Sequence, residues 1–181
     1  MSLDDPKPLT ARIEVFRPGT FTPMEGAPLT FSAADLRAIA DAYDSKATPA
    51  PIVVGHPAID APAYGWIDSI DYDAGAERLV ANLRDIDPAF AELVKAGRFR
   101  KVSMSYFSPN QGHNPVPGTW YPKHVGFLGA AAPAVPGLKN AHFAGAAGVA
   151  RNRRGRRRRL HLSAGGRRVL PQSDLARLGG R

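Results

Sequence analysis

The chain has 181 residues, of which 44% are hydrophobic, and its formal net charge is +8 at pH 7. It contains no cysteine, which excludes disulfides, thiolate nucleophiles and cysteine-bound zinc. No apolar run reaches transmembrane length, and the N-terminal residues lack the basic and apolar regions of a signal peptide. We therefore expect a soluble protein of the cytoplasm that does not bind membranes.

The charge is unevenly distributed, and the composition changes sharply near Gly145. Residues 1–145 contain 13 Lys and Arg against 15 Asp and Glu, whereas residues 146–181 contain 11 Arg and one acidic residue, Asp174. A block of like charges without an aromatic residue repels itself and buries little, so it predicts disorder. We expect a self-contained domain over 1–145 and a disordered, arginine-rich tail over 146–181.

Three interpretations of this tail stay open. It is an arm that binds nucleic acid through its charge, an inert solvated tail, or the product of a frameshift or truncation of a longer protein. The last interpretation follows from composition, because arginine and glycine without lysine are typical of a GC-rich gene read out of frame.

The first half of the body predicts one strand, one helix and a second strand. Residues 12–16 alternate as a strand does, and Pro18-Gly19 follows as a turn. Ser32 and Asp35 have the spacing of a helix cap, and apolar residues follow at helical spacing as far as position 43. A short β-branched run, residues 52–55, predicts a buried strand that ends just before His56.

The second half of the body predicts mainly strands. They are expected at residues 64–71, 78–83, 99–107 and 120–128, with a hairpin loop at 73–76. Asp87-Pro88 predicts the start of a short helix over 89–96, which Gly97 ends. Because strands dominate and helices are short and scattered, we expect an α+β domain built on an antiparallel sheet or barrel.

A histidine and a later serine are the strongest candidates for chemistry. His56 follows the buried strand of residues 52–55, and Ser103 lies within the apolar-flanked strand of residues 99–107. A serine hydroxyl is a poor nucleophile near neutral pH and needs a base within hydrogen-bond reach, which an imidazole supplies. The pair therefore favours serine-type acyl transfer, although one His–Ser pair is a weak signal by itself.

Several short sequence motifs of the body occur together in one known family. They are LTFS at 29–32, APIVVGHP at 50–57, PAYGW at 62–66, GRFRKVS at 97–103, HVGFLG at 124–129 and PAVPGL at 133–138. In this order they resemble the Mu-like phage head maturation protease, called the phage I protein, over roughly residues 12–143.

The resemblance implies a serine endopeptidase that works in the bacterial host cytoplasm, inside the assembling procapsid. Its partners would be the phage scaffold, the major capsid protein and other copies of itself, because such proteases cut the scaffold and themselves. It also implies the fold of the related prohead and herpesvirus-type assembly proteases, a β-barrel ringed by helices. No cofactor and no metal are expected.

The resemblance also implies an order of catalytic residues, in which His56 comes first, Ser103 second and an orienting residue third. His124 on the last predicted strand takes the third place, as in a Ser-His-His triad. The prohead group has glycine two residues after the serine, whereas this chain has Ser105. Ser103 and Ser105 share one strand face by alternation, so Ser105 is the alternative nucleophile.

Other interpretations of these residues remain. His56, Ser103 and His124 are also compatible with ordinary structural positions in strands. A metal site made of His56, Asp60, His113 and His124 has no recognisable ligand spacing. The alternative function is a non-catalytic scaffold or capsid-assembly protein that retains the protease fold, with a tail that binds nucleic acid.

Overall fold

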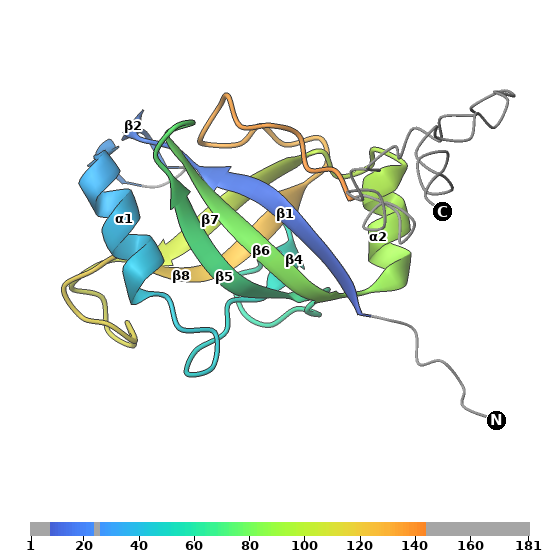
Figure 1. Cartoon of the computed structure of the whole chain (residues 1–181), viewed down its shortest axis with the longest axis horizontal. Helices are drawn as coiled ribbons and strands as arrows, with labels where there is room; N and C mark the ends of the chain where they lie inside the picture. The colour runs from blue at the N-terminus through green and yellow to red at the C-terminus, as the bar shows by residue number, and fades with distance from the viewer. Residues whose placement is uncertain (1–7, 24–25, 144–181) are drawn as a thin grey trace, which may run out of the picture. The chain divides into compact units, whose positions relative to one another are not determined.

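The computed structural model describes residues 8–23 and 26–143, which all belong to the unit of the chain that ends at Val149 (Figure 1). The tail predicted for residues 146–181 lies outside the described residues. The strands are β1 (Leu9–Phe16), β2 (Gly19–Phe21), β3 (Leu29–Phe31), β4 (Ile52–Val54), β5 (Trp66–Asp73), β6 (Arg78–Ile86), β7 (Lys101–Phe107) and β8 (Tyr121–Leu128). The helices are α1 (Ala33–Ala42) and α2 (Pro88–Lys95).

These elements form an α+β domain with mainly antiparallel sheets, as the sequence predicts. One sheet has the order β1-β6-β5 and is antiparallel throughout. A second sheet has the order β4-β8-β7, in which β7 and β8 are antiparallel and β4 and β8 are parallel. The β2–β3 hairpin, which the sequence analysis did not predict, is a separate two-stranded ribbon.

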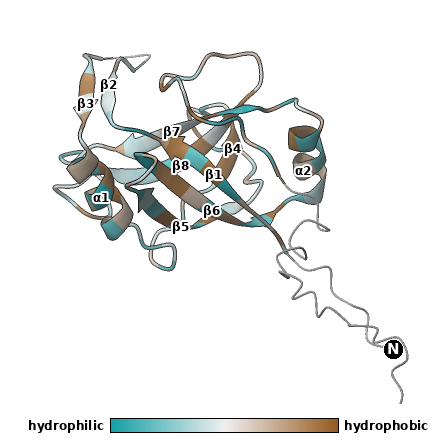
Figure 2. Cartoon of the chain, turned by 45° about the horizontal axis from the view of Figure 1, so that its top comes forward, coloured by the Kyte–Doolittle hydropathy of each residue, from teal (hydrophilic) through white to brown (hydrophobic). Residues whose placement is uncertain are grey.

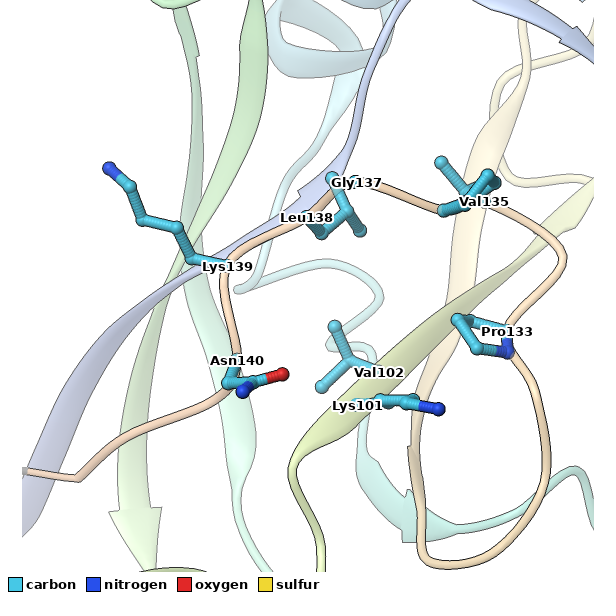
Figure 3. Close-up of a pocket in the computed structure, with 9 residues that line it drawn as sticks. Lys101, Val102, Pro133, Val135, Gly137, Leu138, Lys139 and Asn140 are labelled. Atoms are coloured by element: carbon cyan, nitrogen blue, oxygen red, sulfur yellow. The ribbon is translucent and has the colours of Figure 1, made fainter.

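The sheets do not close into a barrel within the described residues, so that part of the expectation is wrong. Strands β1 and β7 approach each other without forming a β-ladder. The gap is bridged by residues 133–141, which we call the strap. The backbone N–H of Lys139 donates to Glu14 of β1, and that of Ala141 donates to the carbonyl of Arg100, just before β7. The strap covers a hollow of about 190 Å³ between itself and the start of β7 (Figure 3).

Both helices have the predicted caps, and their ends lie within one residue of the predicted positions. Ser32 caps α1, and its backbone N–H donates to the Asp35 carboxylate while its side chain accepts from the Asp35 N–H. Asp87 caps α2, and Gly97 follows its end with a φ of 76°. Each cap satisfies amide groups that have no partner inside the helix, which fixes the boundary.

One hydrophobic core lies between the two three-stranded sheets. Its fully buried members come from both sheets and both helices, and they include Val15, Leu36, Ile67, Phe90 and Phe127. Figure 2 shows the hydrophobic and hydrophilic residues of α2 side by side, as expected of a helix with one buried face. No helix of the described residues is long and apolar enough to span a membrane.

Candidate active site

The first site residue, His56, is positioned by the turn that ends β4. The N–H of Gly55 donates to the carbonyl of Phe127 at 3.0 Å, which extends the β4–β8 pairing by one residue. Gly55 then adopts a φ of 66°, a left-handed conformation that glycine adopts without strain. The chain thereby leaves the sheet, and the next residue, His56, lies over β8.

The structure brings His56 and His124 into direct contact. Nδ1 of His56 and Nε2 of His124 are 2.8 Å apart and hydrogen-bonded, although the residues are 68 positions apart in the chain. The ring centroids are separated by 5.1 Å. Parallel pairing of β4 with β8 sets Val54 beside Phe127, near the end of β8. The chain turns at Gly55, and His56 then reaches His124 further back along β8.

Burial keeps the His124 imidazole neutral near pH 7, whereas His56 is exposed. His124 is only 7% exposed, and its pKa falls to about 4 because of its burial, with smaller contributions from His56 and Lys123. Partial desolvation also lowers the pKa of His56 below the ordinary 6.5. A neutral imidazole pair shares one proton across the hydrogen bond, so one ring donates and the other accepts.

The two candidate serines belong to two cross-strand pairs of β7 and β8 that lie on the same face of the sheet. On β7, Ser105 is directly opposite His124, and Ser103 is directly opposite Gly126. Both serines are half-buried. Val102, which precedes Ser103, and Met104, which lies between the serines, are buried. The predicted alternation of faces is therefore present.

Gly126 makes room for the His56 ring beside Ser103. A Cβ at Gly126 would lie 3.2 Å from Cε1 of His56 and 2.2 Å from the carbonyl oxygen of Gly55. The ring therefore lies over Gly126, which is the cross-strand partner of Ser103. Its Nδ1 reaches His124, which is the cross-strand partner of Ser105. Cross-strand neighbours have Cβ positions about 4.5–5.5 Å apart, so the ring is a close neighbour of Ser103.

The structure places the four predicted site residues, His56, Ser103, Ser105 and His124, on one face of the sheet, but it does not contain the expected serine–histidine hydrogen bond. Among the described residues, neither serine hydroxyl is hydrogen-bonded to a histidine. Asp60 and His113, two members of the metal site considered above, are both exposed. Within the described part of the chain, no group of three or more His, Cys, Asp or Glu side chains is arranged to hold a metal ion.

A cavity beside β7 is the part of the site that the sequence analysis missed. Its volume is about 230 Å³, and it is lined by Phe16, Phe21, Pro23, Leu29, Phe31, Ser103, Met104, Ser105, Tyr106, Trp120, Ala134 and Val135. The β2–β3 hairpin supplies one wall. Polar and apolar residues alternate in Thr20-Phe21 and in Leu29-Thr30-Phe31, as in the strands of a hairpin. Each run is too short to stand out in the sequence.

No protein-family model matches the chain, and no curated protein matches it.

Proposed function

We propose that this protein is a serine endopeptidase in which Ser103 is the nucleophile, His56 the general base and His124 the orienting residue. The observation that carries the proposal is the hydrogen bond from His56 Nδ1 to His124 Nε2. When Nδ1 donates that bond, the other nitrogen, Nε2, has a free lone pair and is able to accept the serine proton. The position of the ring over Gly126 favours Ser103 over Ser105.

The chemistry follows from these roles. Ser103 Oγ attacks the peptide carbonyl carbon while His56 Nε2 takes its proton, and the imidazolium then protonates the leaving amine. Water hydrolyses the resulting ester through the same base and frees the serine. His124 stabilises the donated Nδ1–H and holds one orientation of the His56 ring. Its own low pKa keeps His124 neutral near pH 7, so that its Nε2 is able to accept this hydrogen bond when the ring proton lies on Nδ1.

The narrower proposal is a phage head maturation protease. It is supported by the ordered motifs from residue 12 to residue 143 and by an α+β domain of two mainly antiparallel sheets with two short helices. Its substrates would then be the phage scaffold, the capsid protein and the protease itself, within the procapsid in the bacterial cytoplasm. The related assembly proteases use a β-barrel, whereas the sheets of this protein do not close within the described residues.

One observation favours a second candidate, a non-catalytic assembly protein that retains the fold. Neither serine is bonded to a histidine among the described residues, and Ser105 occupies the position that is glycine in the prohead group. In that case the arginine-rich tail, with 11 Arg in residues 146–181, would bind nucleic acid electrostatically.

Two matched serine variants test the proposal. The full chain is incubated with the scaffold and capsid proteins of the same phage, and products are identified by mass spectrometry. We expect Ser103→Ala to lower the cleavage rate by about 10⁴-fold or more, and Ser105→Ala to keep most of it. Cleavage by both variants at the wild-type rate, or no cleavage by any form, would overturn the protease assignment.

A further inference from the structure

The cavity beside β7 reaches both candidate nucleophiles, because Ser103 and Ser105 line it. Its other walls come from the rest of β7, the β2–β3 hairpin, the end of β1, the residue before β8 and the strap. We call it the aromatic cavity, after the aromatic residues in its lining, which are Phe16, Phe21, Phe31, Tyr106 and Trp120. A group bound in the aromatic cavity is therefore next to the candidate nucleophiles.

The aromatic cavity has a buried floor and an open mouth. Phe16 and Met104 are only 5% and 8% exposed, so they belong to the floor. Leu29 and Trp120 are half-buried, as both serines are, and Ala134 is exposed, so these residues surround the mouth. The backbone edge of β7 is itself covered by β1 and the strap. The cavity therefore admits a single side chain through its mouth, and not an added strand.

The lining of the aromatic cavity suits a large apolar side chain. It contains no Asp, Glu, Lys, Arg or His, so a charged side chain would lose its hydration there without gaining a partner. The rings pack against one another, with centroids 5.3 Å apart for Phe16 and Tyr106 and 5.1 Å apart for Phe31 and Trp120. The volume of about 230 Å³ is below the roughly 300–1,000 Å³ of typical small-molecule sites, which favours one side chain as the occupant.

Covalent geometry decides which substrate side chain is nearest to the cavity. The hydroxyl of Ser103 attacks a carbonyl carbon from about 3–3.5 Å. The residue that supplies this carbonyl has its Cβ two covalent bonds of about 1.5 Å away from the attacked carbon. The side chain of the next residue begins three bonds away and leaves with the amine. The side chain on the acyl side of the scissile bond therefore begins closest to Ser103 and to the cavity that Ser103 lines.

We propose that the aromatic cavity is the specificity pocket of the protease and binds a leucine- or phenylalanine-sized side chain on the acyl side of the scissile bond. The enzyme then cuts after large apolar residues. It discriminates against aspartate, which loses its hydration in the cavity, and against glycine, which leaves the cavity unfilled. Leu29 and Trp120 at the mouth are the residues that determine this specificity. As a statement about the substrate, this inference rests on the proposed protease function.

Cleavage of a peptide library tests this preference. The full-length wild-type protein is incubated with peptides from a digested bacterial proteome, and mass spectrometry identifies the residue before each cut. We expect mainly leucine, phenylalanine, methionine, tyrosine and tryptophan at this position. We also expect kcat/KM for a leucine peptide to exceed that of an otherwise identical aspartate peptide by about 100-fold or more. Cuts without a preference, or cuts after charged or small residues, would overturn the proposal.

Binding without cleavage is measured in the full-length Ser103→Ala protein by NMR titration. The probes are acetylated, amidated tetrapeptides of alanine with leucine, phenylalanine or aspartate in the third position. We expect the leucine and phenylalanine peptides to bind at least about tenfold more tightly than the aspartate peptide. The largest shifts should be those of the Trp120 indole N–H and the Met104 methyl group. Equal binding of all three peptides, or shifts confined to residues outside the lining, contradicts the proposal.

Three glutamate variants locate the binding site. Leu29→Glu places a carboxylate in the lining, and Ala134→Glu places one at the mouth, on an exposed residue whose replacement leaves the core intact. Ala132→Glu is the matched control, because Ala132 is also exposed and lies outside the lining. We expect both lining variants to weaken binding of the leucine peptide by about tenfold or more, and the control to leave it unchanged. Amide spectra show whether each variant is folded, and wild-type affinity in the folded lining variants would sink the cavity assignment.

The protease function and the specificity pocket fail in different ways in these experiments. If the leucine peptide binds as expected while the wild-type protein leaves the peptides and the phage proteins uncut, the protease function fails and the binding site stands. If the phage proteins are cut while the leucine and aspartate peptides bind equally, the specificity pocket fails and the protease function stands.

Discussion

The two three-stranded sheets differ in what their polar side chains do. In the β1-β6-β5 sheet, polar groups on the surface pair with one another. The Asn82 amide, for example, donates to Ser69 and to Asp71, both at 2.8 Å. In the β4-β8-β7 sheet, the hydroxyls of Ser103 and Ser105 form no hydrogen bond within the described residues, and one ring nitrogen of His56 has no hydrogen-bond partner there. Paired polar groups stabilise a fold, whereas groups that keep donors and acceptors free are available for chemistry.

The largest expected effect comes from removing the base in the second sheet. His56→Ala should lower the cleavage rate by about 10⁴-fold, because the serine then has no proton acceptor. His124→Ala should lower it by about 10²-fold, since it removes the orientation of the base and not the base itself. Steady-state cleavage assays measure both.

His113→Ala is the matched control, because His113 is an exposed loop histidine. It should leave the rate unchanged. A rate in His56→Ala equal to that of the control would mean that the histidine pair is structural, like the polar pairs of the other sheet.

A second test adds a single methyl group to the catalytic sheet. In Gly126→Ala the new Cβ would lie 2.2 Å from the Gly55 carbonyl oxygen, so β4 and β8 must separate. We expect a loss of about 3 kcal/mol in the free energy of unfolding, measured by urea denaturation. The control is Gly112→Ala, where nothing lies within 4 Å of the new Cβ, and its stability should stay within about 0.5 kcal/mol. Similar stabilities of the two variants would contradict the close packing of β4 against β8.

The helices and most strand positions were predictable because their signals are local. The Ser32–Asp35 capping box and the Asp87 and Gly97 boundaries each lie within a few residues of the element that they define. Alternation along β7 correctly predicted that Ser103 and Ser105 share a face.

The relations between distant segments were not predictable in the same way. The parallel pairing of β4 with β8 and the strap across β1 and β7 depend on contacts between residues far apart in sequence. The role of Gly126 is also invisible in sequence, because it arises from the carbonyl of Gly55 above it. The resemblance supplied His124 as a candidate, but only the fold brings its Nε2 to 2.8 Å from His56.

The buried histidine predicts a pH dependence of stability. The pKa of His124 is about 4 when folded and about 6.5 when unfolded, so the unfolded chain binds more protons between these values. The contribution of His124 to stability is therefore full above pH 6.5 and is lost progressively as the pH falls toward 4. Urea denaturation at a series of pH values measures this slope. His124→Gln should flatten it, and an unchanged slope would contradict the assigned pKa.

The smallest expected effect concerns a buried hydroxyl next to the cavity. The Tyr106 hydroxyl is buried without a hydrogen-bond partner among the described residues, and burial raises its pKa. Tyr106→Phe should therefore leave stability unchanged or raise it by about 1 kcal/mol. Tyr121→Phe should instead lower it by about 1 kcal/mol, because the Tyr121 hydroxyl donates to the carbonyl of Thr48 at 3.1 Å. Thermal denaturation measures the stability of both variants. Equal losses of stability would show that the Tyr106 hydroxyl has a hydrogen-bond partner.

The central claim is that His56 activates Ser103, and covalent labelling tests it most directly. A fluorophosphonate reacts with a serine whose hydroxyl is activated by a neighbouring base, and mass spectrometry of the digested protein locates the adduct. We predict one adduct, on Ser103, in the wild-type protein and none in His56→Ala. Absence of any adduct, an adduct on Ser105, or equal labelling with and without His56 would contradict the account.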